Sequence, residues 1–281
     1  MLNLIKPRVH NGGRGCANRV TSSCTEEYLL ASCSLAPVMN SNYQLFPHQE
    51  QALEFVRKNK GCAFLAMEMR LGKTLVAIKA YSQVVGPKLV VGPTSVLNGW
   101  QHELTRERLA YHSIYETSGS INRLAELKSI FSKHLTTDGF FLINYEGLRA
   151  CPEIAEIHWA VVILDESTAI KNPKSEISKL CTVAFYNVPN RMCLSGNPAP
   201  ESAMNWYQQM LFIKGFDFMG HINFWEFRNA LFQPVGPEGW DWVPKSGSLN
   251  KIKSALDRTT FFCTRKQANL GNKKIREKRI D

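Results

Sequence analysis

The stretch Met67–Thr74 reads MEMRLGKT and follows the short apolar run Cys62–Ala66. A buried strand, then a tight loop, then Gly-Lys-Thr at the start of an amphipathic segment is the layout of a phosphate-binding loop. In such a loop the backbone N–H groups and the N-terminus of the next helix point at phosphate oxygens. The strict pattern requires glycine at position 67, where this chain has methionine, so Gly-Lys-Thr alone is also compatible with a chance occurrence.

The composition is that of a globular protein with an excess of basic residues. Of the 281 residues, 44% are hydrophobic and 21% are charged, which allows a large buried core. The formal net charge of +10 favours a polyanionic partner, nucleic acid before membrane. No apolar run approaches the roughly 20 residues of a membrane span, and the N-terminus lacks a signal-peptide stretch. The eight cysteines form no paired framework, so we expect an intracellular, cytoplasmic location.

Short apolar runs alternate with helix-length amphipathic segments from Leu45 onward. Five runs are each expected to form a parallel strand covered on both faces: GCAFLA (61–66), KLVVGPT (88–94), GFFLINY (139–145), WAVVIL (159–164) and RMCLSG (191–196). The expected helices include residues 47–59, 96–109, 121–133 and 175–185. This alternation predicts an α/β doubly wound sheet.

Polar clusters follow the carboxyl ends of the predicted strands. They are Lys73–Thr74, Pro93–Ser95, Asn144–Glu146, Asp165–Thr168 and Ser195–Asn197. Ligands bind at this edge of open α/β sheets, so the clusters are expected to form one site.

The acidic pair Asp165-Glu166 ends the apolar run 159–164 and is the strongest single signal. Asp165 would hold Mg²⁺ through water ligands, and Glu166 would orient or deprotonate the attacking water. Lys73 would reach the β- and γ-phosphates, and Thr74 would offer its hydroxyl to the metal. Alternatively, the pair caps the next helix, since aspartate and serine favour such positions. Gly-Lys-Thr upstream favours the nucleotide site.

These motifs, in this order, resemble the first motor lobe of superfamily 2 helicases, specifically of the Swi2/Snf2-like DNA translocases. The resemblance covers residues 45–267. The segments that carry it are LFPHQEQAL (45–53), MEMRLGKT (67–74), VVGPTSVLNGWQHEL (90–104), LINYEGLR (142–149), DESTAIKNPKSEISK (165–179), LSGNPAPES (194–202) and KSALDRTTFFCTRKQ (253–267).

The resemblance implies a RecA-like P-loop NTPase lobe that binds ATP and Mg²⁺, with helices on both faces of a parallel sheet and a helical C-terminal extension. The residues that it implies for ATP are Gln49, Met69, Arg70, Leu71, Gly72, Lys73 and Thr74. The motif that it implies for coupling ATP to nucleic acid is Ser195, Gly196 and Asn197. The backbone-binding face that it implies for sequence-independent contact with duplex DNA contains Thr94, Ser95, Tyr145 and Lys171.

The expected organisation is a loosely ordered basic leader (1–40), the ATP-binding lobe (41–214), a helical extension (215–267) and a basic tail (268–281). In the leader, the spacing of the candidate zinc ligands lacks any C-x₂₋₄-C pair, which argues against a metal site; they are His10, Cys16, Cys24 and Cys33. The aromatic residues after position 205 are interpreted as core before base-stacking surface, and residues 233–248 as a loop.

The chain departs from the family's pattern at several positions. Arg70 stands where the family has glycine, and Ser167-Thr168 replaces Ala-His, which removes a histidine expected to help couple the metal to the next motif. Ser195 and Asn197 replace two threonines. The chain also stops where the second motor lobe is expected to begin, so a lobe supplied in trans is an expected partner.

We therefore predict a DNA-dependent ATPase lobe, weak by itself, with Lys73, Asp165 and Glu166 as its catalytic residues. One alternative is a nucleotide- and nucleic-acid-binding module with little catalysis. Another is a phosphate-loop ATPase without a nucleic-acid role, against which the blocks at 93–95 and 144–146 argue. For Lys171 and the basic tail, a solvated charged surface is an open alternative.

Overall fold

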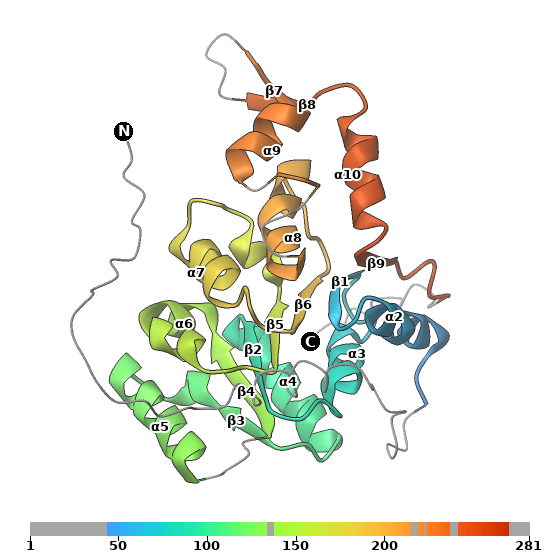
Figure 1. Ribbon diagram of the computed structural model, residues 1–281. Helices are drawn as coiled ribbons and strands as arrows, with labels where there is room; N and C mark the ends of the chain where they lie inside the picture. The colour runs from blue at the N-terminus through green and yellow to red at the C-terminus, as the bar shows by residue number, and fades with distance from the viewer. Residues whose placement is uncertain (1–43, 134–137, 215–218, 222, 237–240, 270–281) are drawn as a thin grey trace, which may run out of the picture. The chain divides into compact units, whose positions relative to one another are not determined.

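The main sheet has seven parallel strands in the order β3-β4-β2-β5-β6-β1-β9 (Figure 1). The computed structural model describes residues 44–133, 138–214, 219–221, 223–236 and 241–269. The strands are β1 Cys62–Met67, β2 Pro87–Gly92, β3 Tyr111–Ser113, β4 Gly139–Asn144, β5 Val161–Asp165, β6 Asn190–Ser195 and β9 Thr260–Cys263. Because all neighbouring strands pair in parallel, their carboxyl ends meet at one edge.

Helices cover both faces of this sheet (Figure 1). The helices are α2 Pro47–Lys58, α3 Lys73–Tyr81, α4 Thr94–Arg106, α5 Ser120–Lys133, α6 Tyr145–Ala150, α7 Glu176–Ala184, α8 Trp206–Lys214, α9 Phe224–Leu231 and α10 Ser248–Leu256. Short 3₁₀ turns are η1 Ile114–Glu116, η2 Pro152–Glu156, η3 Ser167–Ile170 and η4 Ala203–Asn205. One core cluster includes Val76 of α3 and Trp100 of α4, and the other includes Cys181 of α7 and Met210 of α8.

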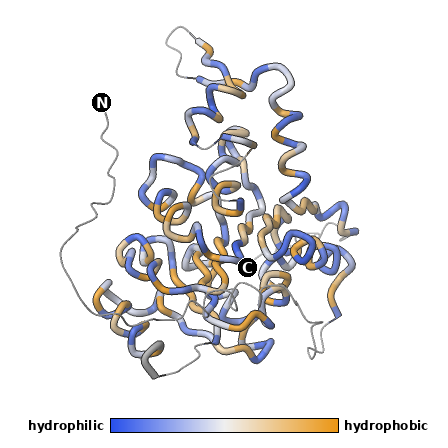
Figure 2. Tube along the Cα trace, viewed as in Figure 1, coloured by the Kyte–Doolittle hydropathy of each residue, from blue (hydrophilic) through white to orange (hydrophobic). Residues whose placement is uncertain are grey.

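The strands are continuously apolar because both of their faces are buried. In β1, Ala63 and Leu65 belong to one core cluster, whereas Phe64 and Ala66 belong to the other, as the alternation of side chains along a strand requires. Figure 2 shows hydrophobic stretches along the central strands and mixed hydropathy along the outer helices. The prediction of a doubly wound sheet is confirmed, as are its five strands.

Two strands and one hairpin escaped sequence analysis. β3 has only three residues, none of them fully buried, so it lacks the apolar run that marked the others. β9 follows α10 after a short turn. Its exposed Phe262 interrupts the apolar pattern, so its pairing with β1 could not be predicted from the sequence. The expectation of a loop at 233–248 is wrong: β7 Phe232–Val235 and β8 Asp241–Pro244 form an antiparallel pair. Proline is tolerated there because both strands are edges of a two-stranded sheet.

The segment predicted as a helical extension contains α9 and α10, but it also contains this hairpin and β9. Since β9 pairs with β1, the main sheet includes residues on both sides of the predicted boundary at 214. The aromatic residues after position 205 belong to the core where they are buried, as at Trp206, Tyr207 and Phe227, whereas Trp225 is exposed.

Several predictions fall on residues outside the described part of the chain. These are the basic leader at 1–40, including the zinc candidates His10, Cys16, Cys24 and Cys33, and most of the basic tail at 268–281. Among the described helices, none has the length and hydropathy needed to cross a bilayer.

Candidate nucleotide-binding site

The phosphate-loop candidate connects β1 to α3 and is held tightly by α2. Gly72 has φ +80°, and a Cβ atom there would lie 2.2 Å from Gln49 Nε2, so only glycine fits. Gln49 Nε2 donates to Leu71 O at 3.1 Å, and His48 Nε2 lies 3.1 Å from the same oxygen. Gln49 Oε1 accepts from Phe46 N at 3.0 Å. In this structure Gln49 therefore fixes the loop, while the role assigned to it toward adenine remains a proposal.

Lys73 lies across the loop, at the first position of α3. Its Nζ donates to Met67 O at 2.9 Å and to Glu68 O at 3.4 Å. Burial lowers the pKa of Lys73, while the nearby carboxylates of Asp165 and Glu166 act in the opposite direction. Lys73 and the acidic pair thus lie close enough to interact electrostatically at the same edge of the sheet.

The two acidic residues end β5 in different environments. Asp165 is 3% exposed; its Oδ2 accepts from Trp100 Nε1 at 2.8 Å and its Oδ1 from Glu166 N at 2.8 Å. Burial raises the pKa of Asp165 above its ordinary value. Burial, followed by the charge of Asp165, raises the pKa of Glu166. Glu166 is also held at φ 46°, a left-handed conformation that side chains other than glycine rarely adopt.

The chemistry of this edge fits a magnesium–triphosphate. When ionised, two carboxylates beside one lysine carry an excess of negative charge, which a divalent cation would balance. Within the described residues no group of three or more His, Cys, Asp and Glu side chains could hold a metal alone. Mg²⁺ in proteins ordinarily binds one or two protein groups together with waters and substrate phosphates. Thr74 and Asp165 could be those protein groups.

Two cavities flank the loop. The first, of about 470 Å³, is lined by Gln44, Phe46, His48, Gln49, Arg70, Leu71, Gly72, Lys73, Thr74, Leu75, Gly99, His102, Glu103 and Arg106. Its volume lies within the range of small-molecule sites. The second, of about 540 Å³, is lined by Glu68, Met69, Glu166, Thr168, Gly196, Asn197, Pro200 and Arg265. Six of the seven residues predicted for ATP line the first cavity. The seventh, Met69, lines the second cavity, as does Glu166.

Arg70, which stands where the family has glycine, has a strained backbone. Its φ is 68° and its side chain is exposed. A left-handed backbone costs an L-residue about 1–2 kcal/mol of folding free energy, which replacement by glycine would recover. Glycine also makes the unfolded chain more flexible, which cancels part of this gain. We expect Arg70→Gly to raise the thermal midpoint by about 2–4 °C, and Arg70→Ala, which keeps the strain, to leave it unchanged. Differential scanning fluorimetry of both variants checks this; an equal shift in both would contradict it.

The loop after β6 packs against the phosphate loop. Ser195 is fully buried, and its Oγ accepts from Asn197 N at 3.2 Å. A Cβ atom on Gly196 would lie 3.7 Å from Met67 O and 3.6 Å from the Met69 side chain. The predicted coupling motif is thus in contact with the loop that would hold the phosphates, although its role in coupling remains a proposal.

The residues predicted to contact nucleic acid differ in exposure. Thr94 and Ser95 are exposed at the start of α4, and Lys171 is half-buried beside η3, where it pairs with Glu201. Tyr145 is only 6% exposed, and its hydroxyl donates to Asp165 O at 2.9 Å. Tyr145 is therefore a core residue that supports Asp165. The proposed contact surface comprises Thr94, Ser95 and Lys171.

Sequence analysis missed other residues of the site. Trp100 supplies the hydrogen bond to Asp165, and only its match to a family segment drew attention to it. Arg265 lines the second cavity because β9, which was not predicted, delivers it beside Glu68, whose Oε2 accepts from Arg265 N at 2.9 Å. Gln209 gave no signal because it stands inside an aromatic, helical segment.

Comparison with known proteins agrees with this geometry. Residues 48–256 match the model of the SNF2-related domain. The chain is 27% identical over 241 residues to human chromodomain-helicase-DNA-binding protein 6, and 33% identical over 168 residues to the ISWI chromatin-remodeling complex ATPase ISW1 of Saccharomyces cerevisiae. These alignments cover 78% and 56% of this chain, but only 9% and 14% of the relatives.

Solved structures show the same fold. The SWI2/SNF2 ATPase core of Sulfolobus solfataricus in complex with dsDNA superposes with a TM-score of 0.63 at 24% sequence identity. The superposition covers 82% of this chain and 47% of that core, so the chain spans about half of its length. Since the domain model covers most of the chain, the chain belongs to the SNF2-related domain family.

Proposed function

We propose that this chain is the N-terminal, ATP-binding lobe of a DNA-dependent ATPase that couples ATP hydrolysis to movement on DNA. Membership of the SNF2-related domain family supports the class of activity. The observation that carries the proposal is the meeting of Lys73 with Asp165 and Glu166 at one sheet edge, where their charges interact.

In the proposed mechanism the first cavity receives the nucleotide. N–H groups of the loop and of the α3 N-terminus bind the phosphates, and Lys73 exchanges its bonds to Met67 O and Glu68 O for phosphate oxygens. Thr74, and Asp165 through water ligands, would hold Mg²⁺, which would supply charge compensation for the phosphates. Glu166 would accept a proton from the attacking water, and burial, which raises its pKa, makes it a stronger base than an exposed carboxylate.

Turnover by these 281 residues alone is proposed to be slow. Arginines supplied by another domain accelerate phosphoryl transfer by about 10³–10⁵-fold, equivalent to about 4–7 kcal/mol of barrier. The test measures ATP hydrolysis with and without duplex DNA, and with a second motor lobe added in cis or in trans. The proposal expects DNA-stimulated turnover only with the second lobe; fast turnover by the 281 residues alone would overturn it.

The proposed DNA surface comprises Thr94, Ser95 and Lys171. Hydroxyl groups and a lysine bind phosphates without reading sequence, and for one lobe we expect a salt-sensitive Kd of about 10⁻⁴–10⁻⁶ M. Lys171 directly follows η3, the turn that begins after Glu166, so this turn would connect the proposed DNA surface to the proposed ATP site. Within the described part of the chain, the cysteines at 62, 151, 181, 193 and 263 form no disulfide, which agrees with the proposed reducing, intracellular setting.

Lys171 and Glu201 provide a matched pair of tests for this surface, because they neutralise each other in the free protein. We expect Lys171→Ala to weaken duplex binding and to reduce the slope of log Kd against log salt by about 1. Glu201→Gln frees the lysine and is expected to tighten binding. Fluorescence anisotropy over a range of salt concentrations measures both effects. Unchanged slopes in both variants would assign Lys171 to an ordinary solvated surface.

A second candidate function is a nucleotide- and nucleic-acid-binding module with little catalysis. The substitutions at Ser167-Thr168, Ser195 and Asn197 favour it, because they alter the parts that link hydrolysis to DNA. The two functions differ in one result: Glu166→Gln slows hydrolysis in an ATPase and changes nothing in a binding module.

A further inference from the structure

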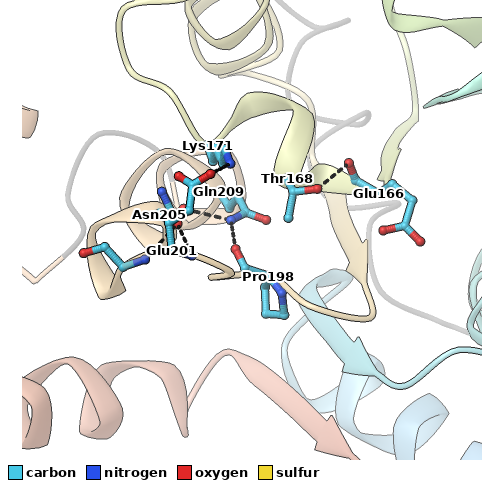
Figure 3. A network of polar contacts seen from close by, with 8 residues as sticks. Glu166, Thr168, Lys171, Pro198, Glu201, Asn205 and Gln209 are labelled. Carbon is cyan, nitrogen blue, oxygen red and sulfur yellow. Dashed lines mark hydrogen bonds and ion pairs between the residues drawn. The ribbon is translucent and has the colours of Figure 1, made fainter.

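Gln209 of α8 is completely buried and makes three hydrogen bonds to three different parts of the chain. Its Oε1 accepts from Ser167 Oγ at 2.7 Å. Its Nε2 donates to Pro198 O at 2.7 Å and to Asn205 O at 2.8 Å (Figure 3). Both hydrogens of the amide and its oxygen are therefore used, and a fully satisfied buried amide holds its neighbours in fixed positions.

Two of the residues that Gln209 contacts are the chain neighbours of residues in the proposed catalytic site and coupling motif. Ser167 directly follows Glu166 and is itself fully buried. Pro198 directly follows Asn197, and both Glu166 and Asn197 line the second cavity. One side chain thus joins the turn that carries the proposed general base to the loop that packs against the phosphate-loop candidate.

The same turn leads to the proposed DNA surface. η3 spans Ser167–Ile170, and Lys171, the next residue, pairs with Glu201, three residues after Pro198. Figure 3 shows these contacts side by side: Lys171 with Glu201, Gln209 with Pro198 and Asn205, and Thr168 with Glu166. Asn205 also accepts from the main-chain N–H groups of Glu201 and Ser202 through its Oδ1.

We propose that Gln209 is a positioning residue that couples nucleotide binding to DNA binding by holding the Glu166–Lys171 turn and the Asn197–Glu201 loop as one unit. This inference rests on the proposed function. Two sites that bias one shared element influence each other's affinity by a common factor, commonly about 5–150-fold. Cutting the link at Gln209 removes that factor without removing either binding site.

The experiment measures the Kd of the 281-residue protein for a fluorescent duplex with and without Mg²⁺ and AMP-PNP. For wild type we expect the nucleotide to change the Kd by about 5-fold or more. In Gln209→Met and in Ser167→Ala this ratio is expected to fall to about 1, with each ligand alone bound within about 2-fold of wild type. The double variant is expected to resemble Gln209→Met, since both changes cut one connection.

Gln208→Met is the matched control, because Gln208 is the buried neighbour on the same helix and makes none of the three contacts. It is expected to keep the wild-type ratio. If Gln209→Met fails to fold, Ser167→Ala still tests the link, since it removes one bond and keeps the other two. A wild-type ratio in Ser167→Ala and Gln209→Met, or no linkage in wild type although both ligands bind, overturns the inference. Failure of wild type to bind nucleotide overturns the proposed function instead.

Discussion

Replacing Glu166 with glutamine is expected to lower the single-turnover rate of ATP hydrolysis by about 10²–10⁴-fold, while the affinity for ATP stays within about 2-fold. Glutamine keeps the size of the side chain but cannot accept the proton of the attacking water. Because binding depends on the loop and on Lys73, only the chemical step is affected. Single-turnover hydrolysis with excess protein in the presence of the second motor lobe, and displacement of a fluorescent nucleotide by ATP, separate the two quantities.

Glu68→Gln is the control for this substitution, because Glu68 lines the same cavity and carries the same charge. Its Oε2 accepts from Arg265 N, a bond that the glutamine oxygen can still accept. We expect hydrolysis by Glu68→Gln to stay within a few-fold of wild type. Equal losses in the two variants would show that general negative charge in the cavity, and not a base at Glu166, matters.

Replacing Glu166 with glutamine is also expected to change how the stability of the folded protein depends on pH. The pKa values of Asp165 and Glu166 are raised above their ordinary values of 3.8 and 4.5, so the folded state holds these protons more tightly than the unfolded state. Their contribution to stability is therefore present below the ordinary values and is lost as the pH rises through the raised ones. As the pH rises from the ordinary pKa values through the raised ones, the nucleotide-free Glu166→Gln protein should therefore lose less stability than wild type. Thermal midpoints measured across this pH range check the difference.

Lys73→Ala is expected to weaken binding of ATP with Mg²⁺ by about 100-fold or more. Each hydrogen bond to a charged group contributes about 1.5–3 kcal/mol, and each 1.4 kcal/mol corresponds to a tenfold change in affinity. The lysine is already positioned, since its two present acceptors are carbonyl oxygens at the start of the loop. Isothermal titration calorimetry with AMP-PNP and Mg²⁺ measures the loss.

Lys58→Ala serves as the control, because Lys58 is an exposed lysine at the end of α2 that pairs with Glu54 at the surface. It should bind nucleotide like wild type. Retention of wild-type affinity by Lys73→Ala would remove the basis of the proposed site, whatever the behaviour of Glu166.

Much of the fold could be predicted because strands buried on both faces need continuous apolar runs, and five such runs stand out in the sequence. β9 could not, because it is a short edge strand whose Phe262 is exposed and whose partner β1 lies almost 200 residues away in the chain. The hairpin of β7 and β8 was hidden by prolines, which a two-stranded sheet tolerates.

Within the site, the loop and the acidic pair were predictable because their residue types and spacing follow from phosphate and metal chemistry. Burial was not. Tyr145 stood among polar residues after a strand, yet its ring is buried and its hydroxyl supports Asp165. Gln209 is the converse case, a polar residue hidden among aromatics, whose importance depends on partners far away in the sequence.

β9 has a mechanical consequence. Glu68 N donates to Cys263 O, and Arg265 N donates to Glu68 Oε2, so the segment that leaves the sheet after Cys263 is fastened to the phosphate loop itself. Lys73 holds Glu68 O from the other side. In the proposed site, a triphosphate that draws Lys73 away from Glu68 O would remove one of the bonds that hold this junction, so nucleotide binding would change how firmly the segment after Cys263 is attached to the phosphate loop.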